Sequence, residues 1–111
     1  PLSPFEAELT VWVQQHYAED MALEDAAESM GMSPFYFSRQ VKAVTGKTFL
    51  DFFTSYRIEK AKKRLTSTEL SVSEVARSVG YPDSNYFAKV FMRTVGCTPT
   101  TYRNTVTQST R

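Results

Sequence analysis

The chain has 111 residues, 41% of them hydrophobic and 14% aromatic, with a formal net charge of +1 at pH 7. That length and composition suit one domain with a buried core, and neither a membrane-spanning run nor a signal peptide is visible. A single cysteine, Cys97, excludes an intramolecular disulfide and a cysteine-rich metal site, so we expect a cytoplasmic protein without membrane contact, metal or cofactor.

Apolar periodicity and helix-end signals predict seven helices and no strand. The first three cover residues 4–17, 22–30 and 34–45. Serine followed by proline opens the first and third of them, because serine is a good N-cap and proline is favoured at the first helical position. Gly46 ends the third helix, since glycine commonly follows a helix in the left-handed conformation.

A long fourth helix is expected over residues 49–65, and a fifth from Ser71 to Gly80. The apolar stripe of the fourth helix consists of Leu50, Phe53, Ile58, Ala61 and Leu65. Ser71 and Glu74 have the spacing of a capping box, in which each side chain bonds the other residue's backbone N–H. This signal fixes where the fifth helix begins.

The sixth helix is expected between Asp83, its N-cap, and Gly96, its terminator. Pro99 then opens a last short turn of helix that ends at Tyr102. Residues 106–111 are expected to form a disordered tail.

Two halves of the chain repeat each other. Ala27, Gly31, Phe37, Val41 and Gly46 recur 49 or 50 residues later as Ala76, Gly80, Phe87, Phe91 and Gly96. Each copy has the outline of a helix-turn-helix, and a tandem of such units indicates DNA binding. The sequence therefore predicts an all-α, homeodomain-like domain: one unit over residues 1–48, a linker helix over 49–66 and a second unit over 67–105.

Charge is distributed in three blocks. Residues 1–33 carry seven carboxylates and no Lys or Arg, residues 34–66 carry eight basic residues against two acidic ones, and residues 67–111 are mildly basic. A basic centre in a nearly neutral chain is typical of a protein with one face on phosphates. The cluster Lys60, Lys62, Lys63 and Arg64 fits that role or, equally well, the solvated side of a helix.

The third and sixth helices each have an outward face suited to reading bases. In the third helix the inward residues are Phe37, Val41 and Val44, which leaves Phe35, Ser38, Arg39 and Lys42 outward. In the sixth the inward residues are Phe87, Val90, Phe91 and Thr94, which leaves Ser84, Asn85, Ala88, Lys89 and Met92 outward. Arg, Lys, Asn and Ser hydrogen-bond base edges, and Phe35 suits a thymine methyl. Solvent exposure is the weaker explanation for any one of these residues and a much weaker one for the pattern shared by both helices.

Four segments carry a family resemblance: residues 46–65 with Arg57-Ile58-Glu59-Lys60-Ala61, and residues 74–81, 86–91 and 96–103. They resemble the AraC/XylS family of bacterial transcription regulators over residues 5–103. The resemblance implies two helix-turn-helix units joined by a rigid helix and bound to neighbouring major-groove segments on one side of the DNA. The expected DNA-binding residues are Ser33, Phe35, Tyr36, Ser38, Arg39, Lys42, Ser84, Asn85, Lys89 and Arg93.

The chain departs from the family pattern in three ways. Ala22 stands where the other copy has the capping Ser71, and Asp20 is the expected imperfect substitute. Ala26 and Val41 are smaller than the residues usual at those positions, so we expect looser packing in the first unit. Met92 replaces a common basic residue, which removes an expected phosphate contact from the second unit.

These observations predict a sequence-specific DNA-binding domain of a bacterial transcription activator or repressor, with promoter or operator DNA as its partner. A linker helix of about 17 residues is about 25 Å long, which with flanking packing brings the recognition helices near the roughly 34 Å of one DNA turn. RNA polymerase and an upstream sensing or receiver domain are further expected partners, because a chain that starts with Pro1 suggests part of a longer protein.

The alternative is an all-helical protein–protein interaction module that presents Phe35 and tyrosines to a partner. No catalytic constellation or phosphate-binding glycine loop is visible, so an enzyme is not expected.

Overall fold

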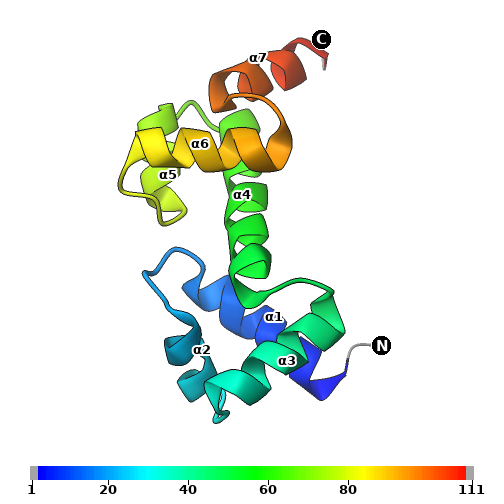
Figure 1. Ribbon diagram of the computed structural model, residues 1–111. Coiled ribbons are helices and arrows are strands. Elements are labelled where there is room, and N and C mark those ends of the chain that lie inside the picture. The colour runs from blue at the N-terminus through cyan, green and yellow to red at the C-terminus, as the bar shows by residue number, and fades with distance from the viewer. Residues whose placement is uncertain (1–2, 110–111) are drawn as a thin grey trace. The chain divides into compact units, whose positions relative to one another are not determined.

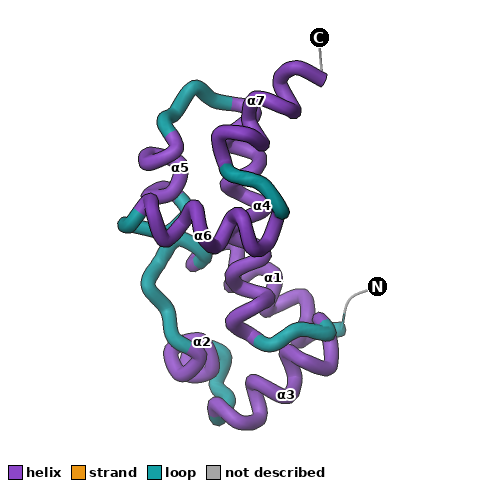
Figure 2. The backbone as a smooth tube through the Cα atoms, turned by 45° about the horizontal axis from the view of Figure 1, so that its top comes forward, coloured by secondary structure: helices purple, strands orange, loops and turns teal. Residues whose placement is uncertain are grey.

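The computed structural model describes residues 3–109, which contain seven helices and no strand (Figures 1 and 2). The helices are α1 (Pro4–His16), α2 (Leu23–Ser29), α3 (Pro34–Thr45), α4 (Phe49–Ser67), α5 (Val72–Ser78), α6 (Ser84–Val95) and α7 (Pro99–Ser109). The predicted all-α class is confirmed. No helix in this part of the chain has both the length and the apolar character needed to cross a membrane.

The chain divides into two compact units, Pro1–Tyr56 and Arg57–Arg111. The first, here called unit 1, holds α1, α2, α3 and the start of α4. The second, unit 2, holds the rest of α4 with α5, α6 and α7 (Figure 1). Each unit thus contains one copy of the sequence repeat.

Helix ends follow the local sequence signals. At each predicted N-cap the side-chain oxygen accepts a first-turn backbone N–H at 2.9–3.2 Å. The four capping residues are Ser3, Ser33, Ser71 and Asp83. Gly46 and Gly96 end α3 and α6 with φ of 76° and 97°, a conformation that side chains other than glycine resist.

The turn that joins the two helices of each unit is the same in both copies. The N–H of Met32 donates to the Ala27 carbonyl at 2.9 Å, and the N–H of Tyr81 donates to the Ala76 carbonyl at 2.9 Å. Both turns contain a glycine at positive φ: Gly31 at 68° and Gly80 at 100°. The repeat therefore extends to backbone hydrogen bonding, and the extra residue of the second copy lies between Gly80 and α6.

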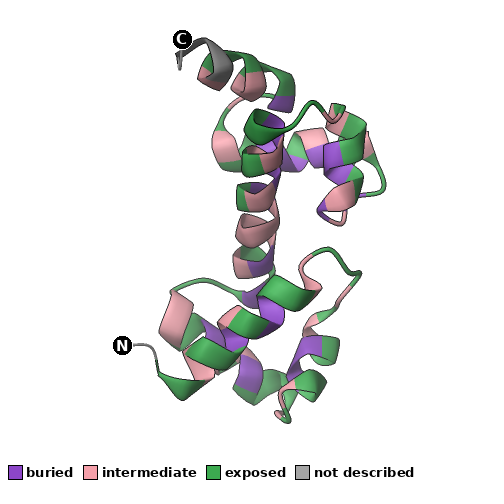
Figure 3. Ribbon diagram, turned by 180° about the vertical axis from the view of Figure 1, so that it is seen from behind, coloured by how far each residue is buried: buried purple, intermediate pink, exposed green. Residues whose placement is uncertain are grey.

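Unit 1 is built on an aromatic cluster. The Trp12 ring lies 6.0 Å from Phe49 and 5.9 Å from Phe53, and Phe37 lies 5.4 Å from Phe49, centroid to centroid. The small residues Ala26, Ala27 and Val41 are fully buried in the same cluster. Figure 3 shows this burial on the inward faces of the helices. Large rings from α1 and α4 thus accompany the small residues of α2 and α3.

Unit 2 has its own core, closed by a basic residue from α7. The rings of Phe87, Phe91 and Tyr102 form a chain with centroid separations of 5.8 and 5.7 Å. Arg103 donates from Nε to the Leu65 carbonyl at 2.7 Å and from Nη2 to the Leu70 carbonyl at 2.6 Å. It thereby satisfies the Leu65 carbonyl in the last turn of α4 and the Leu70 carbonyl in the loop before α5.

Four expectations need correction. Leu50 was expected on the buried stripe of the fourth helix, yet it is 71% exposed and Phe49 is buried instead. Adjacent helix positions point about 100° apart, so only one of the two faces the core, and the stacking of Phe49 on Phe53 at 5.4 Å selects the phenylalanine. Thr94 is exposed, because the buried stripe of α6 ends at Phe91.

The other two corrections concern helix ends. The last helix runs to Ser109 rather than stopping at Tyr102, so it enters the expected tail; no Gly or Pro interrupts residues 100–109, and residues 110–111 lie outside the described range. Ala22 caps α2 without a side-chain acceptor, and the one side-chain bond there runs from its N–H to Asp25 Oδ2 at 2.9 Å. Asp25, not Asp20, is therefore the compensating residue.

Candidate nucleic-acid interface

The N-terminal half of α3 presents an aromatic and basic surface. Phe35 is 71% exposed and Tyr36 is 53% exposed, which is unusual for rings of this size. The guanidinium carbon of Arg39 lies 5.5 Å from the centroid of the Phe35 ring. This cation–π contact aligns Arg39 along the outer face of the helix.

The remaining predicted residues of unit 1 surround that pair. Ser33 is exposed and its oxygen accepts the N–H of Tyr36 at 3.2 Å, which leaves the hydroxyl proton available as a donor. Lys42 is exposed, whereas Ser38 is half-buried. A shallow cavity of about 420 Å³ is lined by Ser38, Arg39, Lys42, Ala43 and Thr48. The structure therefore places all six predicted residues of this unit in the first three turns of α3 or at its cap.

In unit 2 the predicted residues share α6. Asn85, Lys89 and Arg93 are exposed and follow one another at intervals of four, so they form one stripe along the helix. Ser84 is half-buried at the start of the helix. Asp83 holds this end by accepting the N–H groups of Asn85 and Tyr86 at 2.9 and 3.3 Å.

Comparing the units position by position shows one residue that the sequence reading missed. Tyr86 corresponds to Tyr36 and is equally exposed, at 54%. Its ring lies 5.9 Å from that of Tyr81, over which the Arg57 guanidinium sits at 5.0 Å. The 50-residue offset of the repeat would have identified Tyr86.

The comparison also resolves the missing basic residue of α6. Lys42 corresponds to the exposed Met92, while Ala43 corresponds to the exposed Arg93. The positive charge of α6 is therefore displaced by one residue along the helix rather than lost. Arg39 and Lys89 are basic at the same position in both units.

First-turn charges separate α3 and α6 from the helices that precede them. The helices α1, α2 and α5 carry acidic residues in their first turns, whereas α3 and α6 carry none. A helix N-terminus has a partial positive charge that attracts phosphate, and a carboxylate there would compete for it. The first turns of α3 and α6 thus contain no acidic residue, and the one carboxylate at these two helix starts is the N-cap Asp83 of α6.

Two residues of the basic cluster of α4 make contacts within the chain. Arg64 donates from Nη1 to the carbonyl and hydroxyl oxygens of Ser78 at 2.9 and 2.7 Å. Lys62 Nζ lies 3.2 Å from Glu59 Oε1 and 5.7 Å from the Tyr102 ring centroid. Both side chains are half-buried and bonded within unit 2, so the solvated-side reading offered by the sequence does not describe these two residues.

Two repeated units, each with a glycine turn between helices and an exposed basic second helix, define a tandem helix-turn-helix DNA-binding domain. A family model described as "Helix-turn-helix domain" matches residues 26–105. The chain is similar to the MmsAB operon regulatory protein of Pseudomonas aeruginosa, with 36% identity over 90% of this chain and 33% of that protein. It is also similar to the transcriptional activator RhaS of Salmonella schwarzengrund, with 34% identity over 83% of this chain and 33% of that protein.

Solved structures agree with this assignment. The C-terminal domain of AraT, a response regulator from Geobacillus stearothermophilus, matches with a TM-score of 0.88 and 39% identity, covering 94% of this chain and 87% of that one. The DNA-binding domain of AdpA, in complex with a target DNA, matches with a TM-score of 0.84 and 29% identity, covering 89% of each chain. The chain belongs to the AraC-type helix-turn-helix family of transcription regulators. It spans about a third of the length of the regulatory proteins named above.

Proposed function

We propose that α3 and α6 are recognition helices that read two adjacent major-groove segments of one promoter or operator. The observation that most supports this proposal is that an exposed basic residue, Arg39 or Lys89, occupies the same position in two equivalent helices. The connection between the units supports it, because α4 crosses their boundary and contains neither glycine nor proline. The proposed site of action is the bacterial cytoplasm, and the proposed role is binding without catalysis.

In unit 1, Arg39 donates two hydrogen bonds to a guanine, and Phe35 packs against a neighbouring thymine methyl. Their 5.5 Å contact makes them one reading element, since the ring restricts where the guanidinium extends. Ser38 donates to a base beside them. Lys42, Ser33 and Tyr36 contact phosphate oxygens and set the position of the helix.

In unit 2, Asn85 reads an adenine through its side-chain amide and Lys89 reads a guanine. Arg93 lies further along the same stripe and contacts phosphate. It thereby takes the role of the basic residue that is common in the family at the position of Met92. Ser84 and Tyr86 lie at the N-terminal end of α6, where their hydroxyl groups reach the sugar–phosphate backbone of the DNA. The two units therefore read different sequences, because Phe35 and Asn85 occupy equivalent positions.

The longer protein is proposed to carry a sensing or receiver domain. Support comes from the AraT domain, which belongs to a response regulator, and from the length of the regulatory relatives. A contact with RNA polymerase would accompany activation of the kind named for RhaS.

Binding to duplex DNA at several salt concentrations tests the proposal. The logarithm of the association constant should fall linearly with the logarithm of salt concentration, because phosphate contacts release counterions. Lys42→Gln should reduce the magnitude of this slope by about one, the value of one phosphate contact. The matched control is Lys62→Gln on α4, whose ammonium group pairs with Glu59 at 3.2 Å, and it should leave the slope nearly unchanged. Affinity independent of salt would favour the alternative of a protein-interaction module.

A further inference from the structure

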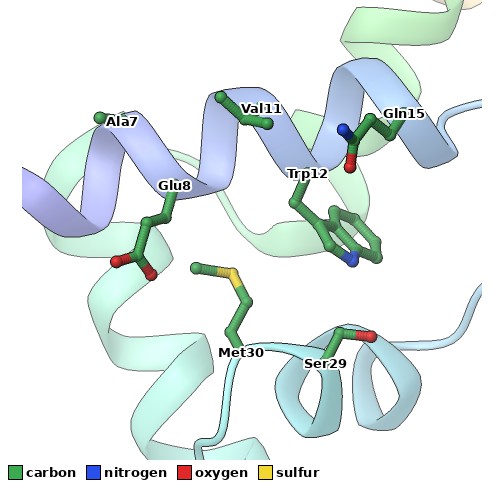
Figure 4. A pocket seen from close by; sticks show the side chains of 7 residues that line it. All are labelled: Ala7, Glu8, Val11, Trp12, Gln15, Ser29 and Met30. Atoms are coloured by element: carbon green, nitrogen blue, oxygen red, sulfur yellow. The ribbon is translucent and has the colours of Figure 1, made fainter.

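Unit 1 has a cavity that the proposed DNA contacts do not use. It is shallow and open to solvent, lies between α1 and the C-terminal end of α2, and has a volume of about 480 Å³ (Figure 4). Its lining includes Glu8, Val11, Trp12, Gln15, Ser29 and Met30. The volume is within the range of small-molecule sites, as is an apolar lining with a few polar groups.

Trp12, which lines this cavity, has a buried donor without a partner. The residue is only 7% exposed, and its Nε1 is buried without a hydrogen-bond partner among the residues that the structure describes. Figure 4 shows the indole nitrogen facing α2, beside the side chains of Met30 and Ser29. The Ser29 hydroxyl already donates to the Asp25 carbonyl at 3.0 Å. Because an indole N–H only donates, a molecule bound here must offer an acceptor to satisfy it.

The charge of the cavity selects the sign of its ligand. Glu8 is an exposed carboxylate on the rim, and none of the lining residues is basic. Residues 1–33, from which the whole lining is drawn, contain seven carboxylates and no Lys or Arg. This field attracts cations and repels anions.

The apolar walls specify the body of the ligand. Val11 is 51% exposed at the cavity, and Met30 is half-buried opposite it. Methionine is unbranched and adapts to differently shaped ligands, so Met30 can move aside to admit an acceptor to the Trp12 N–H. An aromatic or branched aliphatic group fits between these side chains.

We propose that this cavity binds a small organic cation with an apolar body and a hydrogen-bond acceptor. The ammonium group pairs with Glu8, the apolar body packs against Val11 and Met30, and the acceptor takes the Trp12 indole proton. The site is independent of the proposed DNA contacts, because no lining residue belongs to α3 or α6.

Trp12 is the only tryptophan of the chain, so its indole N–H gives one NMR signal that reports on the cavity directly. The full chain should be titrated with 4-methoxybenzylammonium, which has charge, ring and acceptor. We expect a saturable downfield shift of this signal. The isosteric 4-ethylbenzylammonium, which lacks the acceptor, should bind about twofold to tenfold more weakly. The anion 4-methoxyphenylacetate should not saturate.

Glu8→Gln should weaken binding of 4-methoxybenzylammonium about twofold to fivefold while leaving the neutral 4-methoxybenzyl alcohol unaffected, which also shows that the variant is folded. Glu24→Gln is the matched control, since Glu24 is an exposed carboxylate of α2 outside the lining. The proposal is overturned if no compound shifts the indole signal saturably, if the anion binds as tightly as the cation, or if Glu24→Gln weakens binding as much as Glu8→Gln.

Discussion

Replacing Ala22 by serine should stabilise unit 1, because the backbone there is already that of a capped helix. Ala22 has φ −92° and ψ 164°, close to the extended conformation of Ser71 at the equivalent position of unit 2. Ser71 accepts the Glu74 N–H at 3.1 Å, and the Glu74 carboxylate accepts the Ser71 N–H at 3.0 Å. In unit 1 only the second of these bonds exists, from the Ala22 N–H to Asp25.

The new hydroxyl would accept the Asp25 N–H and complete the capping box. Ala22 is exposed and lines a cavity of about 350 Å³, so one more oxygen meets no packed neighbour. Alanine-to-serine exchange at an N-cap is worth about 1 kcal/mol, with a range of about 0.5–2. For a unit of this size, 1 kcal/mol corresponds to about 4–8 °C in the melting temperature.

Thermal unfolding followed by Trp12 fluorescence measures the effect, since the only tryptophan lies in the core of unit 1. Ala18→Ser is the matched control, because Ala18 is exposed outside any helix and should change the midpoint little. An unchanged or lowered midpoint for Ala22→Ser would refute the reasoning that α2 lacks only this bond.

Three further predictions concern the proposed contacts and the turns. Arg39→Ala should weaken specific binding by about 1–3 kcal/mol and relax preference at one base position, as measured by selection from randomised DNA; an unchanged preference would assign Arg39 to the surface or to phosphate. Gly80→Val should destabilise unit 2 by about 1–3 kcal/mol in a helix-dichroism melt, because φ is 100° there; a melt like that of the parent would contradict this. The Ser71 N–H lowers the pKa of Glu74 below its ordinary value. Because the pKa of Glu74 is lower in the folded state, the ionised carboxylate contributes fully to the free energy of unfolding above its ordinary pKa of about 4.3, and this contribution is lost as pH falls through the folded pKa. The stability difference between the parent and Glu74→Gln, measured by unfolding at several pH values, should therefore shrink only at acid pH.

Local signals were sufficient to predict the helix ends that carry a capping serine or aspartate or a terminating glycine. Serine or aspartate caps and terminating glycines act within four residues, so their outcome depends little on the rest of the fold. The repeat predicted the two equivalent turns for the same reason, since one backbone path requires glycine at one place in each copy. The outward face of α3 followed from the buried positions of Phe37 and Val41.

Features that depend on distant partners escaped sequence reasoning. Phe49 and Leu50 are both apolar neighbours, and only the rings of Trp12 and Phe53 decide which of them is buried. Arg64 and Arg103 look like surface charges in the sequence. Each nevertheless donates hydrogen bonds to backbone carbonyls of residues at least 14 positions away in the chain. The unpartnered indole of Trp12 is likewise a property of packing.

The most direct test of the account is the affinity of the full chain for its preferred duplex before and after insertion of five base pairs between the two read clusters. Five base pairs rotate the second cluster by about half a turn, to the opposite side of the DNA. If both units read one site, affinity should fall toward that of a duplex with one cluster destroyed, a loss larger than the roughly 1–3 kcal/mol of a single mismatch. Affinity that survives the insertion unchanged would contradict the account, because it would mean that only one unit engages DNA.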